Sequence, residues 1–533
     1  MARLHEYQGK ELLKQQGIHI PRGAVVSTPQ GAASAAEEIG LPVVIKAQVW
    51  TTGRAGMGGI RFADTAEEAR AAAAEILSMQ VENFPVECVL VEEKLNIERE
   101  FYVGLIVDDG ARRPVILFSS VGGTGVEDVA GQHPDKVVRQ PIDVVEGLHA
   151  YQARNIVRRA GISGRLQVQL ADVLEKLYLV ARRVEARAAE INPLVLTVGG
   201  EIVAADCRIT VDDYAVYRHP ELGIDIAREL NHPPTELERI AYRVEENDYR
   251  GTFYFIQLAQ GFQAGEGYIG FHGAGGGGSM MSMDAVTRWG FKVANFCDTS
   301  GNPPASKFYR AAKIILSQPN IDGYFESGSG VASQEQFHIA RALVKAFREE
   351  NLSIPAVLRL GGNGEDLAAH IIRAYTRDLP APVEVYQKDD SADYCAQRLR
   401  RLVDAHQSRS REQDEARSSP PDDAPPQQPY TFDIRTGTIT FDHAQCVNCE
   451  SKICIQACVP QILKLENDLP VLAITREEAQ RGGCIECLAC EVECWFHGRN
   501  GAKIELPIEG LDEYRQKTRR ASEAVESVAS VER

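Results

Sequence analysis

The chain has 533 residues, of which 44% are hydrophobic and 25% charged, and its formal net charge is −17. This length exceeds one hydrophobic core and predicts roughly three or four domains of ordinary globular composition. The acidic charge argues against a nucleic-acid-binding protein, which needs a concentrated basic face. No apolar run approaches the about 18 residues of a membrane span, and the first residues lack the apolar core of a signal peptide, so we expect a cytoplasmic protein.

A nucleotide site is predicted close to the N-terminus. Residues 1–20 read as a helix followed by a short extended piece, and Pro42–Lys46 is a compact buried strand. The strand leads into the glycine-rich segment Thr51–Gly59, whose backbone amides can approach phosphates closely. Such a loop alone is more often a flexible hairpin. Lys46 on the preceding strand favours phosphate binding, because its ammonium group supplies a point charge for a triphosphate.

Oxygen ligands for a metal ion follow on later strands. Glu190 and Asn192 alternate along one predicted strand, so both side chains face the same side. Asp206, at the end of the next apolar segment, can reach the same place from a neighbouring strand. Oxygen atoms of this kind beside a lysine and a glycine loop suit Mg²⁺ bound together with a nucleotide. The alternative is that these polar strand ends face water.

Several segments of the chain carry a family resemblance. They are Leu4-His-Glu-Tyr-Gln-Gly-Lys-Glu-Leu, Val44-Ile-Lys-Ala-Gln-Val, Gly53-Arg54, Glu190-Ile-Asn-Pro-Leu-Val and Ala205-Asp206. In this order, over roughly residues 1–400, they closely resemble the β subunit of succinyl-CoA synthetase. The resemblance implies an ATP-grasp fold that binds ATP and Mg²⁺. It implies these site residues: Lys46 and Arg54 on the ATP phosphates, Gly53, Glu92 and Glu100 among the nucleotide-binding residues, and Asn192 and Asp206 as magnesium ligands.

Two loops depart from that family. Trp50–Gly56 stands where the family usually has His-Ala-Gly-Gly-Arg-Gly-Lys, so a histidine and a basic residue are lost. Val121–Gly125 stands where the family has Glu-Gly-Gly-Val-Glu, so two carboxylates are lost. We therefore expect ATP binding, with changes in how the phosphate is passed on.

From about 235 to 405, apolar strands alternate with helical patterns, which predicts a parallel sheet covered on both faces. Two glycine-rich turns, His272–Ser279 and Ser327–Val331, each join a strand to a helix and offer backbone amides to an anion. Both coincide with turns of the synthetase's ligase domain. The resemblance implies that Gly328 and Gly330 hold phosphate at the ligase site.

His272 stands where that family has an asparagine, in a turn that is longer here. A changed carboxylate pocket follows, so succinate is not assumed to be the acid. We interpret His272 as a hydrogen-bonding residue of this pocket. The alternative is a histidine that is itself phosphorylated, although the family's phosphohistidine belongs to a separate α subunit.

Residues 406–430 are polar and rich in proline, which predicts a flexible linker. An extended proline-rich chain spans about 3 Å per residue, so the module that follows can dock or swing. The charged tail, residues 509–533, is expected to be helical and solvated.

Eight of the 12 cysteines form two runs beyond the linker, in the pattern of a protein that holds two iron–sulfur clusters. In such proteins the fourth cysteine of each run crosses to the other cluster. We therefore assign the first [4Fe–4S] cluster to Cys446, Cys449, Cys454 and Cys494, and the second to Cys458, Cys484, Cys487 and Cys490. Zinc bound by four cysteines is the alternative. The scattered cysteines, which we expect in the core, are Cys88, Cys207, Cys297 and Cys395.

The segment Gly483-Cys-Ile-Glu-Cys-Leu-Ala-Cys resembles the ferredoxin-like proteins that accompany electron-transfer-flavoprotein:quinone oxidoreductases. Compared with bacterial ferredoxins, the first run has a wider gap, and Trp495-Phe496 follow the last cysteine where proline is usual. These differences are expected to affect the reduction potential of the clusters and their exposure to solvent.

Together these patterns predict an α/β protein. Its parts are an ATP-grasp domain (1–234), a doubly wound, flavodoxin-like ligase domain (235–405), the linker (406–430), a small α+β ferredoxin-like domain with two [4Fe–4S] clusters (431–508), and the tail (509–533). Our first hypothesis is the β-type subunit of an ADP-forming acyl-CoA synthetase. An α-type subunit that binds CoA and carries the phosphohistidine would be its partner.

Two other hypotheses remain. In one, the ligase body has degenerated and the chain is an electron-transfer or scaffold subunit of an acyl-CoA-linked oxidoreductase complex. In the other, the clusters dock a ferredoxin- or flavin-dependent oxidoreductase that makes or consumes the acyl-CoA. A purely structural role for the clusters is also open.

Overall fold

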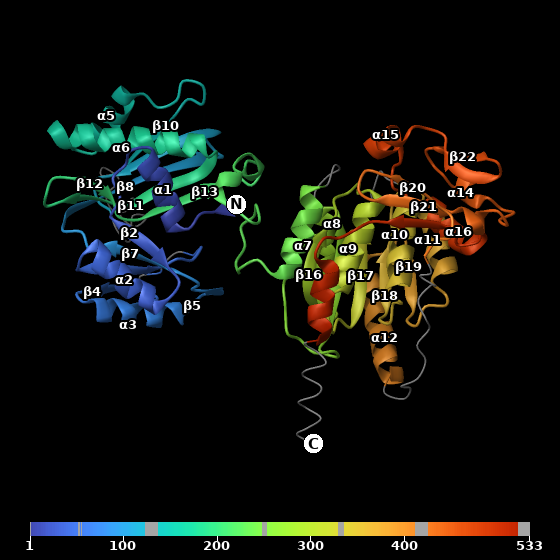
Figure 1. Ribbon diagram of the computed structural model, residues 1–533. Coiled ribbons are helices and arrows are strands. Elements are labelled where there is room, and N and C mark those ends of the chain that lie inside the picture. The colour runs from blue at the N-terminus through green and yellow to red at the C-terminus, as the bar shows by residue number, and fades with distance from the viewer. Residues whose placement is uncertain are drawn as a thin grey trace, which may run out of the picture. The chain divides into compact units, whose positions relative to one another are not determined.

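The computed structural model describes residues 2–51, 54, 56–122, 137–247, 253–328, 335–410 and 425–520. The chain divides into two units, Met1–Pro234 and Thr235–Arg533, which are described separately (Figure 1). Within the described ranges, no helix combines the length and the apolar character that crossing a membrane requires.

The first unit contains a large antiparallel sheet in the order β1–β13–β11–β8–β9–β10, with β12 paired to β11. The strands are β1 (Ala2–Arg3), β8 (Ile97–Asp108), β9 (Arg113–Ser119), β10 (Val137–Pro141), β11 (Ala186–Thr197), β12 (Ile202–Ala204) and β13 (Cys207–Val211). Three helices pack with it: α1 (Glu6–Gln15), α5 (Ala150–Arg159) and α6 (Gly164–Arg183). Leu170, Leu174 and Leu177 recur at helical spacing on α6 and are buried in the core of this layer.

A smaller antiparallel sheet of the first unit runs in the order β2–β7–β3–β4. Its strands are β2 (Gly23–Val26), β3 (Val43–Ala47), β4 (Ile60–Ala63) and β7 (Val89–Glu93), and α2 (Pro29–Ile39) and α3 (Ala66–Leu77) cover it. A short hairpin, β5 (Gln80–Val81) and β6 (Phe84–Pro85), precedes β7. Lys46 lies opposite Leu90, two residues from Glu92, so the Lys46 and Glu92 side chains share one face.

The second unit is built on a sheet in the order β14–β16–β15–β17–β18–β19, parallel except for β14. Its strands are β14 (Tyr254–Gln257), β15 (Tyr268–Ala274), β16 (Lys292–Asp298), β17 (Gly323–Gly328), β18 (Ala356–Arg359) and β19 (Val383–Tyr386). The parallel strands follow the doubly wound order 2-1-3-4-5, whose ligand crevice lies at the carboxyl ends of the strands, between β15 and β17.

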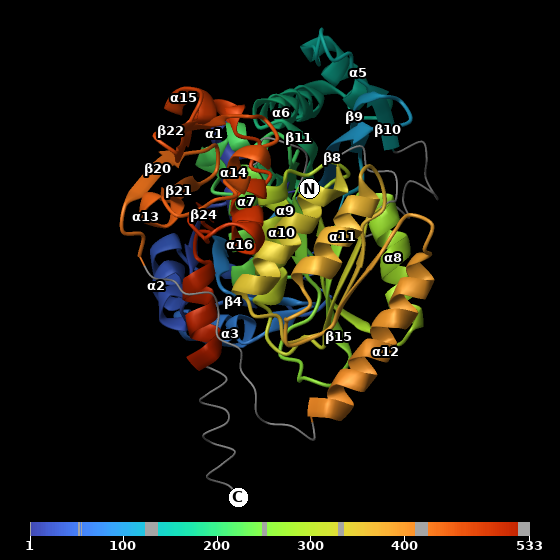
Figure 2. The ribbon, with the colours of Figure 1, turned by 90° about the vertical axis from the view of Figure 1, so that its right-hand side faces the viewer.

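Helices cover both faces of this sheet. One face carries α8 (Gly276–Arg288) and α12 (Ala392–Ser410), and the other carries α7 (Glu236–Glu246), α9 (Ala305–Leu316), α10 (Gln336–Glu349) and α11 (Glu365–Tyr375) (Figure 2). The predicted parallel sheet with two covered faces is therefore present, with one antiparallel edge strand. Because α12 continues to Ser410, the predicted linker begins as helix, and its central part, 411–424, lies outside the described residues.

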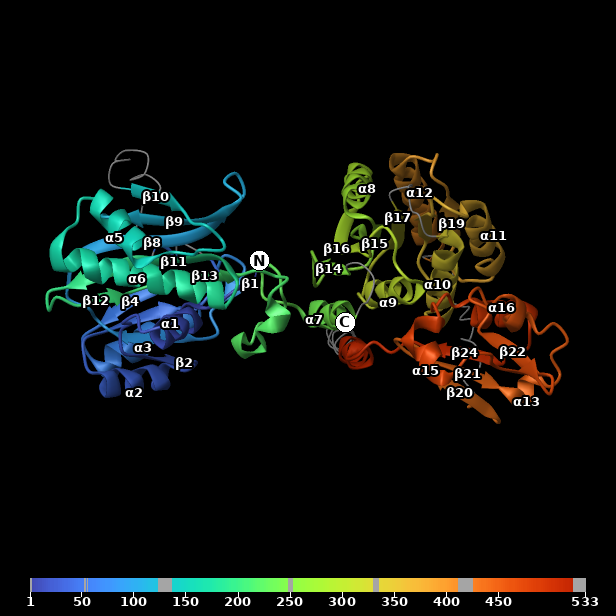
Figure 3. The ribbon, with the colours of Figure 1, turned by 90° about the horizontal axis from the view of Figure 1, so that it is seen from above.

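The cysteine-rich module follows and packs on the α9–α10–α11 face (Figure 3). It has a sheet of β20 (Pro429–Asp433), β21 (Thr438–Asp442) and β24 (Ala502–Glu505), a hairpin of β22 (Leu463–Glu466) and β23 (Leu469–Leu472), and the short helices α13 (His443–Cys446), α14 (Ile453–Gln456), α15 (Arg476–Glu478) and α16 (Ala489–His497). Phe347 of α10 and Val492 of α16 belong to one buried core. The module is thus docked on this face in the structure.

The expected solvated tail is partly packed instead. Residues 511–520 form a helix, and Leu511 is buried in the core of the second unit. The Arg515 guanidinium lies 2.9 Å from a carboxylate oxygen of Glu350 and donates to the Ser317 hydroxyl at 2.8 Å. A buried leucine and a paired arginine hold this part of the tail, which a charge count alone does not reveal.

Candidate functional site

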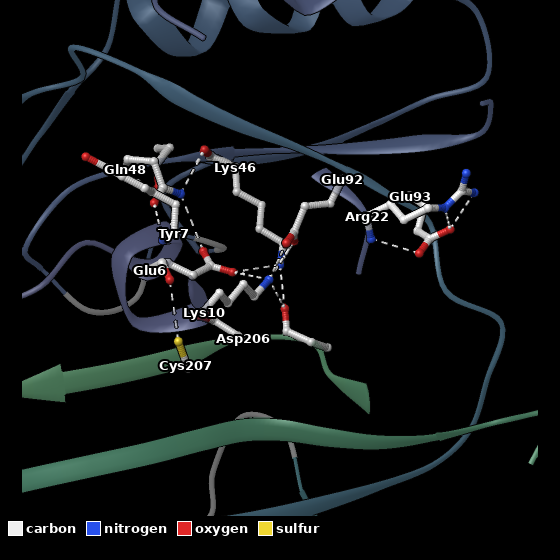
Figure 4. Close-up of polar contacts among 12 residues, drawn as sticks. Glu6, Tyr7, Lys10, Arg22, Lys46, Gln48, Glu92, Glu93, Asp206 and Cys207 are labelled. Atoms are coloured by element: carbon white, nitrogen blue, oxygen red, sulfur yellow. Dashed lines mark hydrogen bonds and ion pairs between the residues drawn. The ribbon is translucent and has the colours of Figure 1, made fainter. Parts of the chain in front are cut away.

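Six charged side chains converge between the two sheets of the first unit, and all of them except Arg54 are labelled in Figure 4. We call this group the ion cluster. α1 supplies two of them, β3 and β7 one each, and the loop after β3 and the segment before β13 the remaining two. Its members are Glu6, Lys10, Lys46, Glu92, Arg54 and Asp206.

Lys46 lies at the centre of the ion cluster. Its Nζ is 2.9 Å from Glu6 Oε1 and 2.8 Å from Glu92 Oε2, and it donates to the Ala205 carbonyl at 2.7 Å. Lys10 bonds the same three partners, at 2.8 Å from Glu6, 2.5 Å from Glu92 and 2.8 Å from the Ala205 oxygen. Burial works to lower the pKa of Lys46, but Glu6 and Glu92 outweigh it and raise that pKa above its ordinary value. Lys46 is therefore a fixed cation.

Arg54 links the lysines to Asp206. Its Nη2 lies 2.9 Å from Asp206 Oδ2 and 3.0 Å from Glu6 Oε2, and its Nη1 donates to the Ala47 carbonyl at 2.8 Å. Against the effect of burial, the surrounding cations hold the pKa of Glu6 well below its usual range. Burial and the Glu6 charge raise the pKa of Asp206 to about 6. An additional cation beside Asp206 would therefore favour the charged form of its carboxyl group.

The structure brings Asn192 to the same place. The backbone N–H of Asn192 donates to the backbone carbonyl of Asp206 at 3.3 Å, so the two predicted magnesium ligands are on neighbouring backbone segments. Glu190 lies nearby on β11 and accepts from the Tyr102 hydroxyl at 3.2 Å. Glu100 is half-buried on β8, and the ion pairs of the ion cluster do not extend to it within the described ranges. Gly53 lies outside the described residues.

Sequence reasoning did not assign a site role to Glu6 or Lys10. Their spacing of four residues on α1 is that of an ordinary exposed ion pair. In the structure both side chains are at most 2% exposed, because α1 packs with β13 and its charged edge turns toward β3 and β7. A signal was available, because Glu6 and Lys10 both lie in the segment Leu4-His-Glu-Tyr-Gln-Gly-Lys-Glu-Leu that carries the family resemblance.

The second predicted site lies at the carboxyl end of β15. His272 is fully buried, stacks on Phe308 with ring centroids 3.8 Å apart, and forms a 2.5 Å hydrogen bond between Nδ1 and the Tyr324 hydroxyl. Its Nε2 has no hydrogen-bond partner in the part of the chain that the structure describes. Burial lowers the pKa of His272 to about 3, so the imidazole is neutral.

A carboxyl group that the sequence did not single out accompanies His272. Glu326 of β17 lies opposite His272 in the strand register and is 1% exposed, and burial raises its pKa well above the ordinary value. Gly328 ends this strand, and its carbonyl accepts from Arg359 Nη1 at 2.8 Å. Gly330 lies outside the described residues, so its predicted role stays a prediction.

The eight clustered cysteines surround two small cavities. Cys446, Cys449, Cys454 and Cys494 line one of them. Cys458, Cys484, Cys487 and Cys490 line the other. Within the described ranges, no three Cys, His, Asp or Glu side chains are grouped in the way that a single metal ion requires. The thiols are thus spread around two spaces, and the last cysteine of each run belongs to the other run's set.

Local backbone geometry explains how one short run lines a cavity. Glu486 and Leu488 have φ of +53° and +59°, in the left-handed region that side chains rarely adopt. These two turns curl the segment so that Cys484, Cys487 and Cys490 face the same space. Such strain is often kept where it serves a site.

Comparison with known proteins supports the ATP-grasp fold that the sequence predicts for the first part of the chain. The ATP-grasp domain family matches residues 3–196. The structure is similar to ATP citrate lyase from Methanothrix soehngenii, with a TM-score of 0.60 over 75% of this chain and 99% of that one. At 20% identity, this likeness concerns the fold alone. The predicted α/β ATP-grasp fold is confirmed.

Sequence relatives are closer. The chain is 39% identical over 369 residues to the GDP-forming succinate–CoA ligase β subunit of Thermus thermophilus, covering 69% of this chain and 93% of that protein. It is 35% identical over 373 residues to the ADP-forming succinate–CoA ligase β subunit of Ignicoccus hospitalis, with 69% and 93% covered. The family resemblance seen in the sequence is thereby confirmed. The chain belongs to the family of succinate–CoA ligase β subunits and is a subunit of an acid–thiol ligase.

Proposed function

We propose that this chain is the β-type subunit of an ADP-forming acid–CoA ligase that also carries two [4Fe–4S] clusters. The reaction is carboxylate + CoA + ATP ⇌ acyl-CoA + ADP + phosphate, with the phosphohistidine on a separate α-type subunit that binds CoA. One observation carries the ligase part of the proposal: Lys46, Arg54 and Asp206 converge beside Asn192, between the two sheets of the first unit.

The nucleotide chemistry follows from the charges of the ion cluster. Lys46 and Arg54 hold fixed positive charges for the phosphate oxygens, which is how phosphoryl transfer is chiefly promoted. Glu6 and Glu92 keep these cations in place before the nucleotide arrives. Asn192 and Asp206 supply the oxygen atoms for Mg²⁺, which when bound bridges phosphate oxygens and offsets their charge. Glu100 and Gly53 complete the nucleotide pocket in this proposal.

At the second site, Gly328 and Gly330 hold the phosphate that passes between the subunits. Burial lowers the pKa of His272 and raises the pKa of Glu326, which favours the uncharged form of each, so these side chains shape the pocket chiefly through hydrogen bonds. The succinate–CoA ligase family, by resemblance, has an asparagine where this chain has His272. Because the pocket is changed at this position, we infer that a carboxylic acid other than succinate is the substrate.

The donor set supports the clusters. Each cavity is lined by four cysteines, as a [4Fe–4S] cluster requires, and the sets match the crossed assignment of a two-cluster ferredoxin. A structural zinc ion, bound by four sulfurs at about 2.3 Å, is the alternative for such a donor set.

The ligase proposal is tested by combining the chain with an α-type partner and screening carboxylic acids for CoA-dependent ADP formation. We expect ADP formation with one class of acid. Nucleotide binding without any acid-dependent ADP formation would contradict ligation and favour an electron-transfer or scaffold role. The cluster proposal is tested separately, by measuring iron and acid-labile sulfide in anaerobically purified protein. A metal content of zinc alone would contradict it.

A further inference from the structure

A cavity of about 670 Å³ lies where the ligase-like domain meets the cysteine-rich module and the tail, and we call it the junction cavity. Small-molecule sites usually measure about 300–1,000 Å³, so this volume suits a ligand. Its wall is formed by α7 and α9, by the turn between β20 and β21, and by the segment 507–513. The last two parts lie beyond residue 400, outside the region that carries the family resemblance. The resemblance therefore assigns no role to this cavity.

Arg310 of α9 ties the parts of this wall together. Its Nε donates to the Pro507 carbonyl at 3.1 Å, its Nη1 to the Thr436 hydroxyl at 2.9 Å and its Nη2 to the Thr436 carbonyl at 2.5 Å. One turn earlier, the Ser306 hydroxyl donates to Glu486 of the module at 2.5 Å. Both Arg310 and Ser306 are buried. The junction cavity is thus bounded by elements that are already fixed to one another, as is usual for a ligand site.

Positive charge is concentrated in the buried part of the wall. Lys307 and Arg310, both on α9, are 2% and 6% exposed, and Arg243 and Arg435 contribute two more guanidinium groups at exposed positions. The lining carboxylates are all exposed and belong to the segment 507–513; they are Glu509, Asp512 and Glu513. Solvent and salt screen exposed charges more strongly than buried ones. The protected part of the junction cavity therefore favours an anion.

The beginning of α9 adds hydrogen-bond donors to this charge. The helix starts at Ala305, and the residue at its N-cap, Pro304, has no side-chain oxygen that could cap it. Pro304, Ser306 and Lys307 all line the cavity. The first N–H groups of a helix have no partner within the helix, and the helix dipole is positive at this end. Donors and buried cations thus occur together in one cavity, which is the combination that phosphate groups require.

We propose that the junction cavity binds a phosphorylated small molecule, with its phosphate held by Lys307, Arg435 and the first turn of α9. The planar guanidinium groups of Arg243 and Arg435 match phosphate oxygens. The exposed carboxylates of the segment 507–513 accept hydrogen bonds from hydroxyl or amino groups elsewhere in the ligand. Such a ligand touches the ligase-like domain and the module together, so its binding stabilises the docked arrangement. This inference depends neither on the ligase reaction nor on the clusters.

The test uses the full-length chain, purified anaerobically, with Lys46→Met to weaken the nucleotide site of the first unit. Inorganic phosphate, ribose 5-phosphate, ADP and CoA are the probes in isothermal titration calorimetry. We expect at least one organic probe to bind at a single site per chain, and the affinity to fall as salt is added. Replacing Arg243 and Arg435 together, as Arg243→Gln/Arg435→Gln, should weaken this binding by about tenfold or more, because hydrogen bonds to charged groups are lost.

Arg239→Gln/Lys464→Gln is the matched control. It also removes two positive charges at exposed positions, one on α7 and one on the module, but neither residue lines the cavity. It should bind the same probe as tightly as the Lys46→Met chain does. Equal weakening in the two double variants would overturn the inference, because general charge attraction would then explain the binding.

Hydrogen exchange of the otherwise unchanged chain gives a second readout that needs no substitution in the cavity. The bound probe should slow exchange in the first turn of α9 and in residues 507–513. Binding without this protection would place the probe elsewhere and would contradict the proposal. Absence of binding by every probe would overturn it as well, and binding of inorganic phosphate alone would exclude an organic ligand. The choice between ribose 5-phosphate, ADP and CoA then identifies the class of molecule.

Discussion

Nζ of Lys10 lies 2.5 Å from Oε1 of Glu92 and 2.8 Å from Oε1 of Glu6, and none of these side chains is more than 2% exposed. Removing one partner of a buried ion pair leaves an uncompensated charge, which typically costs about 3–5 kcal/mol. We therefore expect Lys10→Met to lower the free energy of unfolding by about that amount in urea denaturation. Lys14→Met, at an exposed position of the same helix, should change it by less than about 0.5 kcal/mol. Equal effects of the two substitutions would contradict the buried network.

Lys46 should dominate nucleotide affinity. A hydrogen bond to a charged group contributes about 1.5–3 kcal/mol, which corresponds to roughly ten- to a hundredfold in affinity. Lys46→Met is therefore expected to weaken Mg-ATP binding by that factor in isothermal titration calorimetry. Lys94→Met, one residue beyond the end of β7 and exposed, is the control and should bind as the wild type does. Wild-type affinity in Lys46→Met would place the phosphates elsewhere.

The sequence predicted those residues of this site whose position follows from the local secondary structure. Lys46 and Glu92 are the next-to-last residues of the short apolar strands β3 and β7, and strand alternation gives each side chain a defined face. The role of Glu6 and Lys10 depends on how α1 packs, which is a tertiary effect that no local pattern encodes. The same holds for the tail, where Leu511 joins a core whose members extend back along the chain to Leu237.

The cysteine module shows the same division. The crossed sets that the two-cluster ferredoxin pattern predicts, with Cys494 in one and Cys458 in the other, are the same cysteines that line the two cavities, and their role as cluster ligands stays a prediction. The linker pattern left docking and swinging both open, and the contacts that hold the module could not be foreseen. The glutamates at 486, 491 and 493 look like a solvated acidic surface in sequence, and only the fold brings Lys345 and Arg341 to them.

The crossed sets make a sharp prediction for two cysteines four residues apart. Cys490→Ala and Cys494→Ala should each lose one cluster, or about four iron atoms per chain, but they should lose different clusters. The remaining cluster should therefore have a different midpoint potential in the two variants. Cys88→Ala, at a half-buried position in the first unit, should keep the full iron content. Loss of the same cluster in both variants would contradict the crossed assignment.

Docking of the module can be tested by cutting the chain. Phe347 and Val492 lie in one buried core, and Lys345 pairs with Glu491 across the same interface. If a protease site is placed within 411–424 and cleaved, we expect the C-terminal fragment to co-elute with the rest in gel filtration. Lys345→Glu sets two like charges against each other in a buried place and should release it. Lys464→Glu, on the exposed hairpin, serves as the control. Separation of the cleaved wild type would contradict stable docking.

His272 should make stability depend on pH. Its pKa is about 3 in the folded chain, against about 6.5 for an unfolded histidine, so between these values the unfolded state binds more protons. Stability is therefore lost as the pH falls from about 6.5 toward 3. We expect the difference in unfolding free energy between wild type and His272→Gln to shrink over this range, when urea denaturation is followed at several pH values. His370→Gln, at an exposed position of α11, controls for the substitution itself. A difference that stays constant with pH would mean that His272 is not held neutral by burial.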